Sequence, residues 1–256
     1  MNQHILITGA SRGIGREIAK ALAHPEACVS LIARDVTRLE DVRAELGCKN
    51  IGIHAVDISK VAEVISACDS ATDNFGPVTL LVNNAGAAET APINRTDAAM
   101  LRRMMDVNFY GAFSFIEQLL PGMFKSGLGK IINIGSTAAL EGYAYVSAYC
   151  AAKHALLGFT RALAKEVIGK GIAVAAVCPG FTDTDFLRGS IAYISSKTGR
   201  AQDEIRDHFL ATASQDRFLQ PQEIAAVVKD LCDEPAETLN GKVLRVESSQ
   251  GVRLLS

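Results

Sequence analysis

The sequence lacks the features of a membrane protein, a nucleic acid binding protein and a secreted protein. No apolar run approaches the roughly 18 to 20 residues that a membrane-spanning helix needs, and the first strand-like run, 4–8, starts too early to leave room for a signal peptide. The net charge is −2, with 26 Lys and Arg against 28 Asp and Glu, so no basic field is available to recruit nucleic acid or an anionic membrane. We therefore expect a cytoplasmic protein whose partners include neither nucleic acid nor a membrane.

Cysteine and histidine are present, but not in patterns that hold metals or disulfides. The six cysteines are scattered without a C-x-x-C pair, and the five histidines form no pair with ligand-like spacing. This distribution predicts neither a disulfide framework nor a metal site. Most of the cysteines are expected to be reduced core residues.

The sequence alternates short aliphatic runs with longer segments of helical period. Strand-like runs lie at 4–8, 28–33, 51–56, 78–82, 130–135, 172–178 and 242–246, and helix-like segments lie at 14–24, 36–46, 60–74, 98–124, 147–168 and 221–233. Repeated strand–helix–strand units with nearly continuous apolar strands predict an α/β fold. We expect one domain, residues 1–256, built as a Rossmann-type doubly wound parallel sheet with helices on both faces. A polar insertion at about 181–216 is too long for an ordinary connection and is predicted to be a substrate loop.

A glycine-rich turn follows the first strand-like run. Glycines allow a tight turn and a close approach to a pyrophosphate, whose charge is favoured by the amide groups at a helix start. A glycine-rich turn can also have only a structural role, but its place between a strand and a helix favours the binding of a dinucleotide. The residues predicted to bind the cofactor here are Gly9, Ser11, Arg12, Gly13, Ile14 and Gly15.

The end of the second strand indicates which nicotinamide cofactor is used. An NAD site normally has an acid there for the ribose 2′-hydroxyl, whereas an NADP site has an arginine for the 2′-phosphate. Ala33 stands where the acid is expected, Arg34 follows it, and Arg12 can reach the same phosphate. We therefore expect NADP(H) to be favoured over NAD(H), although a register error of one or two residues would make Asp35 a ribose ligand.

Further cofactor contacts are expected where other strands end, because open α/β sheets bind ligands at their carboxyl edge. Asp57 could accept a hydrogen bond from the adenine amino group, or could belong to a helix cap beside Ser59. The Asn-rich turn after the fourth strand could bind cofactor or clasp the central strands. The predicted contacts are Asp57, Ile58, Asn83, Ala85, Gly86, Pro179, Gly180, Thr182 and Thr184.

Tyr149 and Lys153 are four residues apart in an alanine-rich segment predicted to be helical, so their side chains share one face. An ammonium group near a phenol favours the phenolate and would make Tyr149 a usable acid and base. The same spacing also occurs on ordinary solvated helices. Ser136 follows the fifth strand and could hold a carbonyl oxygen beside the phenol, while Asn108 sits within a helical pattern where it could also simply be solvated.

Together these motifs resemble the short-chain dehydrogenase/reductase family, in order and spacing, over nearly the whole chain. The resemblance implies a sheet of about seven parallel strands and a homo-oligomer, usually a tetramer or dimer. It also implies a catalytic tetrad of Asn108, Ser136, Tyr149 and Lys153. In that tetrad Tyr149 would be the general acid/base, Lys153 would lower its pKa and bind the nicotinamide ribose, Ser136 would orient the carbonyl, and Asn108 would hold a water in a proton relay. Both Tyr149 and Lys153 would also contact the cofactor.

Three tracts, 158–166, 178–181 and 217–221, are similar to family members that act on 3-oxoacyl or 3-hydroxyacyl thioesters of CoA or acyl carrier protein, including polyketide ketoreductases. We expect such a thioester to be the substrate, which would place the protein in fatty acid metabolism. The alternatives are a free steroid, sugar or xenobiotic carbonyl, and a cofactor-binding subunit of a hetero-oligomeric reductase. Basic residues of the insertion could meet the phosphates of a thioester carrier or could be solvated: Arg188, Lys197, Arg200 and Arg206. The C-terminal stretch 245–251 departs from the Asp-Gly-Gly turn of many members.

Overall fold

The computed structural model describes residues 3–213 and 215–255 and is built around one sheet of eight strands. The strand order is β3-β2-β1-β4-β5-β6-β7-β8, and each neighbouring pair is parallel except β7 and β8. The predicted α/β class and doubly wound parallel sheet are therefore confirmed. The strands are β1 (His4–Thr8), β2 (Cys28–Ala33), β3 (Asn50–Ala55), β4 (Leu80–Asn83), β5 (Gly129–Ile134), β6 (Ile172–Pro179), β7 (Val243–Glu247) and β8 (Gly251–Leu254).

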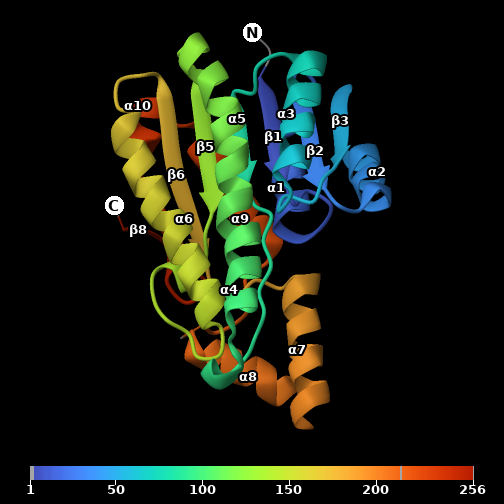
Figure 1. Cartoon of the computed structure of the whole chain (residues 1–256), viewed down its shortest axis with the longest axis vertical. Helices are drawn as coiled ribbons and strands as arrows, with labels where there is room; N and C mark the ends of the chain where they lie inside the picture. The colour runs from blue at the N-terminus through green and yellow to red at the C-terminus, as the bar shows by residue number, and fades with distance from the viewer. Residues whose placement is uncertain (1–2, 214, 256) are drawn as a thin grey trace.

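Helices cover both faces of the sheet (Figure 1). One face packs against α1, α2 and α9, and the other against α3, α5 and α6, each through its own apolar cluster. The helices are α1 (Gly13–Leu22), α2 (Val36–Glu45), α3 (Val61–Phe75), α4 (Ala98–Met105), α5 (Gly111–Ser126), α6 (Ser147–Glu166), α7 (Asp185–Thr198), α8 (Gln202–Thr212), α9 (Pro221–Asp233) and α10 (Ala236–Leu239). None of the helices in the described part of the chain is both long and apolar enough to cross a membrane.

The covering of both faces explains why the strands are apolar throughout. In β1 all five residues are buried, and neighbours in the strand enter different cores. Ile5 and Ile7 belong to the cluster beneath α1 and α9, whereas Leu6 belongs to the cluster beneath α3 and α5. Because successive side chains point to opposite faces, a strand packed on both sides must be apolar at nearly every position.

The segment predicted as one helix, 98–124, is divided in two. A π-helical segment, Asp106–Tyr110, separates α4 from α5 and contains the buried Asn108. The Asn108 amide is bonded to the backbone of Ala87. This contact comes from another part of the chain, so the hydrophobic periodicity of the segment 98–124 does not indicate that the helix is divided. Single π-helical turns of this kind are frequent at functional sites.

The C-terminal residues form an eighth strand where the sequence predicted only a short tail. Gly251 has a left-handed backbone (φ 67°), and the chain after it pairs antiparallel with β7, Val252 facing Val246. Glycine adopts this conformation without the steric cost that other residues meet. The strand exists because the turn returns the chain to a free sheet edge.

The polar insertion contains α7 and α8, which lie beyond the carboxyl ends of the strands (Figure 1). They pack on one another and on the chain before α9 through a small apolar cluster of Leu187, Ile191, Ile205 and Phe218. The insertion therefore stands over the edge of the sheet at which the sequence predicts ligand binding.

Candidate active site

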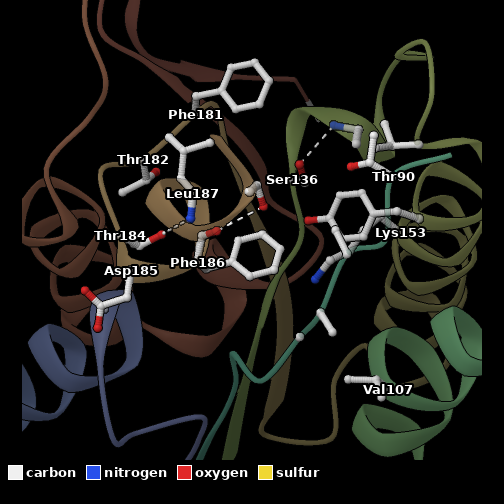
Figure 2. A pocket seen from close by; sticks show the side chains of 18 of the residues that line it. Thr90, Val107, Ser136, Lys153, Phe181, Thr182, Thr184, Asp185, Phe186 and Leu187 are labelled. Atoms are coloured by element: carbon white, nitrogen blue, oxygen red, sulfur yellow. Dashed lines mark hydrogen bonds between the residues drawn. The ribbon is translucent and has the colours of Figure 1, made fainter. Parts of the chain in front are cut away.

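One cavity of about 1530 Å³ runs along the carboxyl ends of the central strands. It begins beside Arg34 and Arg38, passes Tyr149, and ends between α7 and α8. Figure 2 shows Ser136 and Lys153 on one side of it and Thr182, Thr184 and Leu187 on the other. The predicted site residues that line it are Gly9, Ser11, Arg12, Gly13, Ile14, Arg34, Asp57, Ile58, Ala85, Gly86, Ser136, Tyr149, Lys153, Pro179, Gly180, Thr182 and Thr184.

Among the described residues, three predicted site residues lie outside this lining: Gly15, Asn83 and Asn108. A Cβ atom on Gly15 would collide with the Gly9 carbonyl oxygen, so this glycine lets α1 pack closely on the turn that follows β1. Asn83 donates to Asn133 (Nδ2 to Oδ1, 2.9 Å) and thereby ties β4 to β5. Its neighbour Asn84, the first residue after β4, lines the cavity instead.

The glycine turn has the shape that a pyrophosphate requires. Gly9 and Gly13 have positive φ angles of 68° and 55°. Asn84 fixes the turn by donating from Nδ2 to the Thr8 carbonyl at 3.0 Å. Helix α1 begins at Gly13, and within the described chain no side chain caps its amide groups. These N–H groups are therefore available to a phosphate, and the residues fit a bound dinucleotide.

Three arginines stand at the end where the cavity begins, together with Asp35 and Asp185. Arg12 and Arg34 line it as predicted, and Arg38 joins them. Asp35 caps α2 by accepting from the Arg38 N–H at 3.1 Å, and its other carboxylate oxygen lies 3.4 Å from the Arg38 Nε. The sequence prediction missed Arg38, whose signal was its place in the first turn of the helix that follows Arg34.

Asp57 combines a local structural role with a place in the cavity. Its Oδ1 accepts from the Ser59 hydroxyl at 2.7 Å and from the Ser59 N–H at 3.1 Å, as in a local turn. The residue also lines the cavity beside Ile58. Hydrogen bonding from the Ser59 side chain is the main cause that lowers the pKa of Asp57. The carboxylate therefore stays ionised at neutral pH and can accept a further hydrogen bond.

Tyr149 and Lys153 lie on the cavity side of α6, one turn apart. Burial raises the pKa of Tyr149 to about 12, and the nearby Ser136 hydroxyl opposes this shift. Burial also lowers the pKa of Lys153 to about 8. That Lys153 lowers the pKa of Tyr149 stays a prediction. Lys153 Nζ lies 5.8 Å from the centre of the Tyr149 ring and donates to the Ile134 carbonyl, so burial of the phenol dominates.

Asn108 and Lys153 approach each other across Gly86. A Cβ atom on Gly86 would lie 2.8 Å from Asn108 Oδ1 and 3.6 Å from Lys153 Nζ. Asn108 donates to the carbonyl oxygens of Ala87 (2.8 Å) and Met104 (3.0 Å). The asparagine is thus buried and bonded rather than solvated, and it fixes the strand-end loop beside Lys153.

Aromatic side chains line the cavity beyond Tyr149. Tyr143, Tyr145, Phe181 and Phe209 are among them, and Phe181 stacks on Phe209 with ring centres 5.0 Å apart. Tyr143 and Tyr145 both come from the chain just before α6 and are therefore close to Tyr149 in the sequence as well as in the cavity lining.

Two of the four basic residues singled out in the insertion reach this end of the cavity. Lys197 and Arg200 line it. Arg188 instead pairs with Asp183 at 2.8 Å, and Arg206 lies over the Phe218 ring, 5.0 Å from its centre. Neither of these is part of the lining that the described residues form.

Comparison with known proteins agrees with this geometry. Residues 3–195 match the family model described as short chain dehydrogenase. The chain belongs to the short chain dehydrogenase family. It is 36% identical over 249 residues to 2-(S)-hydroxypropyl-CoM dehydrogenase 3 of Xanthobacter autotrophicus, covering 96% of this chain and 95% of that one. It is 34% identical to the 3-oxoacyl-acyl-carrier-protein reductase FabG of Vibrio cholerae, with 94% of each chain covered.

A solved structure has the same fold. The crystal structure of a point variant of the actinorhodin polyketide ketoreductase with NADPH superposes with a TM-score of 0.88 at 30% sequence identity, covering 98% of this chain and 97% of that one. The protein is therefore an oxidoreductase of the short chain dehydrogenase type that acts on ketones and alcohols, and its family binds nicotinamide dinucleotides. The resemblance inferred from its motifs is confirmed.

Proposed function

We propose that this protein is an NADP(H)-dependent reductase of 3-oxoacyl thioesters, or a dehydrogenase of the corresponding 3-hydroxyacyl thioesters. The observation that carries the proposal is the continuity of the cavity. The same space is lined by Arg12 and Arg34 at one end, by Tyr149 and Ser136 in the middle, and by Lys197 and Arg200 at the other end. One long cavity can take a dinucleotide and an extended substrate together, with their reactive atoms near Tyr149.

The cofactor would be held by residues along its whole length. Bound here, a nicotinamide would supply a hydride to a carbonyl carbon or accept one from an alcohol. Arginine favours a ribose 2′-phosphate because its planar head makes paired, charge-assisted hydrogen bonds. The contacts that we propose are Arg12, Arg34 and Arg38 with the 2′-phosphate, Asp57 with the adenine, the glycine turn with the pyrophosphate, Lys153 with the nicotinamide ribose, and Pro179, Gly180, Thr182 and Thr184 with the nicotinamide amide.

The proton would be handled by the tetrad. Tyr149 would donate its hydroxyl proton to the carbonyl oxygen in reduction and recover one in oxidation. Ser136, beside Tyr149 in the cavity lining, would orient the same oxygen and stabilise developing negative charge. Lys153, whose pKa of about 8 keeps it mostly protonated at neutral pH, would replace the lost proton through a water held near Asn108.

The substrate assignment rests on charge and on relatives. Lys197 and Arg200 place cationic groups where a phosphorylated carrier arm would leave the cavity. The FabG relative is named for a 3-oxoacyl thioester of acyl carrier protein. A free ketone is the second candidate, favoured by the aromatic wall of Tyr143, Phe181 and Phe209, against which an apolar ring could pack.

A substrate panel separates the two candidates. NADPH oxidation is followed with acetoacetyl-CoA, with the uncharged ester ethyl acetoacetate and with a bulky ring ketone. We expect acetoacetyl-CoA to be preferred, and Lys197→Ala with Arg200→Ala to raise its KM about tenfold through loss of charge-assisted hydrogen bonds. Arg188→Ala, outside the lining, is the matched control. A preference for the ring ketone that is insensitive to Lys197 and Arg200 would assign the free-ketone function. Cofactor binding without turnover of any carbonyl would assign a binding subunit.

We also propose a homo-oligomer. Phe113, Leu120, Phe124 and Phe159 line an apolar hollow of about 310 Å³ on the outer surface of α5 and α6. Such a surface is favourable only when covered, and a second copy of the chain would cover it with the same apolar side chains. Light scattering tests this: wild type should be an oligomer, and Phe124→Glu, which places a charge in the hollow, should shift it toward the monomer. A monomeric wild type would contradict the proposal.

A further inference from the structure

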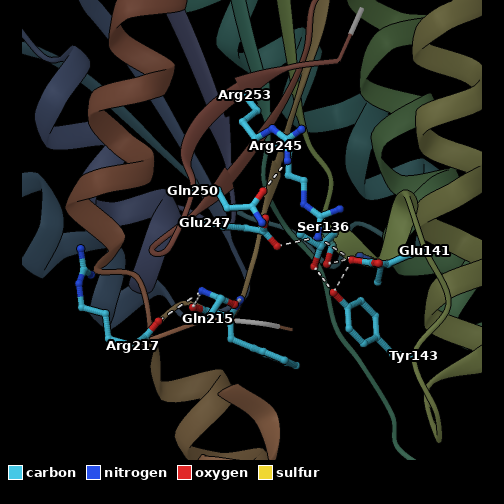
Figure 3. A network of polar contacts seen from close by, with 12 residues as sticks. Ser136, Glu141, Tyr143, Gln215, Arg217, Arg245, Glu247, Gln250 and Arg253 are labelled. Carbon is cyan, nitrogen blue, oxygen red and sulfur yellow. Dashed lines mark hydrogen bonds and ion pairs between the residues drawn. The ribbon is translucent and has the colours of Figure 1, made fainter. Parts of the chain in front are cut away.

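A polar network connects β7 to the wall of the cavity (Figure 3). Arg245 on β7 donates from Nη2 to Glu247 Oε1 and to Glu141 Oε1, each at 2.7 Å. Glu141 belongs to the loop 140–146 that leads into α6. On the same loop the Tyr143 hydroxyl lies 2.9 Å from Glu141 Oε1. An ionised carboxylate only accepts hydrogen bonds, so the phenol donates to it, and the Thr137 hydroxyl, 3.0 Å away, donates to the phenol oxygen.

Tyr143 is the member of this network that reaches the aromatic wall. Its ring lines the cavity and lies 6.1 Å from the ring of Phe181, measured between centres. Phe181 is held separately, because Gln215 accepts its backbone N–H at 2.7 Å. The aromatic wall is thus fixed at two points, by Glu141 and by Gln215.

The loop that carries Tyr143 needs external contacts to keep its shape. Tyr145 has a left-handed backbone (φ 67°), which is unfavourable for a residue with a Cβ atom and persists only when the surroundings impose it. Ala91 holds the loop on one side by donating its N–H to the Tyr145 carbonyl at 2.8 Å. The ion pair of Glu141 with Arg245 holds it on the other.

The two ends of the network differ in rigidity. Glu247 is 2% exposed, so removing its partner Arg245 would leave a buried charge, and the pair is a firm anchor. The Glu141 side chain is 45% exposed, so it can be removed or can separate from Arg245 without leaving an unpaired buried charge on Glu141. The hydrogen bond to Glu247 is the main cause that raises the pKa of Arg245, which stays charged.

We propose that Arg245 is a positioning residue for substrate binding: through Glu141 it fixes the Tyr143 ring against Phe181 and so sets the shape of the pocket beyond Tyr149. Arg245 lies outside the cavity lining of the described chain and acts only through the loop. The proposal rests on the proposed function, because it assigns the aromatic wall to the substrate rather than to the cofactor.

Three variants test the network. Glu141→Ala removes the link and keeps the Arg245–Glu247 pair, Tyr143→Phe removes only the hydroxyl, and Arg245→Met removes the anchor. KM and kcat are measured with acetoacetyl-CoA, or with whichever carbonyl compound the wild type reduces. We expect Glu141→Ala and Tyr143→Phe each to raise KM about three- to tenfold, which corresponds to the free energy of one hydrogen bond. The value of kcat should change less than about twofold. The double variant should match either single one, since both remove the same contact.

Two controls separate positioning from general stability. Glu45→Ala breaks an ion pair of similar exposure with Arg16 and Lys20, away from the cavity, and should leave KM unchanged. Amide hydrogen exchange without substrate should accelerate in residues 140–146 of Glu141→Ala and Arg245→Met, but not of Glu45→Ala.

Each outcome decides between the proposals. An unchanged KM in Glu141→Ala and Tyr143→Phe, additive effects in the double variant, or unchanged exchange in the loop overturns the network. A wild type that reduces no carbonyl compound overturns the proposed function alone, and the exchange experiment then still decides whether Arg245 holds the loop.

Discussion

Lys153 donates its Nζ–H to the carbonyl oxygen of Ile134 across 2.9 Å, at a point where the lysine is only 4% exposed. Ile134 is the last residue of β5, and Ser136 follows two residues later. The lysine therefore links the helix that bears Tyr149 to the strand that delivers Ser136. It holds a positive charge in a place that burial makes unfavourable, which lowers its pKa to about 8.

The first prediction is that Lys153 lowers the stability of the protein. The unfolded lysine binds its proton more tightly than the folded one, so stability is smallest below pH 8 and rises as the pH increases toward 10.5. We expect Lys153→Met to raise the free energy of unfolding at pH 7 by up to about 3 kcal/mol, less the value of the lost hydrogen bond, while reducing activity. Urea unfolding of wild type and variant at about pH 7 and pH 10 measures the free energy of unfolding at each pH. A destabilised variant at pH 7 would contradict the prediction.

The second prediction concerns the phenol of Tyr149. Tyr149→Phe removes the proton donor and should lower kcat by about 10²- to 10⁴-fold, with little change in NADPH affinity. Tyr110→Phe is the matched control, because Tyr110 is 51% exposed and lies outside the cavity lining of the described chain. Steady-state rates and calorimetric titration with NADPH give the two quantities. Full activity of Tyr149→Phe would remove the proposed proton transfer.

The third prediction concerns the choice of cofactor. Arg34→Ala should weaken NADPH binding by about 10- to 100-fold, because that loss corresponds to the free energy of a hydrogen bond to a charged group. It should leave NADH binding nearly unchanged. Arg43→Ala is the control, since Arg43 lies on α2 and pairs with Glu40 on the surface. Competition between the two cofactors in a binding titration provides the measurement. Equal loss for both cofactors would mean that Arg34 does not contact a 2′-phosphate.

The fourth prediction is a loss of stability in mild acid. Burial lowers the pKa of His4 and of His54, and the Nε2 of His54 has no hydrogen-bond partner among the described residues. The unfolded chain binds these protons below about pH 6.5, so stability is complete above that pH and falls as the pH decreases through it. His54→Leu should flatten the pH dependence of urea unfolding between about pH 7.5 and 5.5, by at most about 1.4 kcal/mol per pH unit. The surface substitution His24→Leu is the control. If the free energy of unfolding changes with pH as steeply in His54→Leu as in wild type, the prediction is wrong.

Much of the fold could be predicted because its signals are local. Strand and helix periods located β1 to β7 and most of the helices, since both periods depend on residues a few positions apart. The division of the helix at Asn108 could not be predicted in this way. It depends on a contact with Ala87, which is 21 residues away in the sequence.

The candidate site shows the same division. The spacing of Tyr149 and Lys153 and the glycine turn after β1 could be recognised from the sequence, because a short motif fixes its own geometry. The sequence places Asn83 and Asn84 at the end of a strand, but only the packed sheet decides that Asn83 bonds to Asn133 while Asn84 lines the cavity. The contribution of Arg38 likewise depends on how α2 is placed against the strand ends.

The sequence by itself determined that this is an α/β dinucleotide-binding oxidoreductase, because order, spacing and period are properties of the chain. Only the tertiary structure decided the electrostatics of the site. The pKa of Tyr149 rises and that of Lys153 falls because packing removes both groups from water. The Tyr143 hydroxyl meets Glu141, whose partner Arg245 lies 104 residues further along the chain. Burial and long-range contacts exist only once the chain is folded, so Tyr149 and Lys153 take their protonation behaviour from the fold around them.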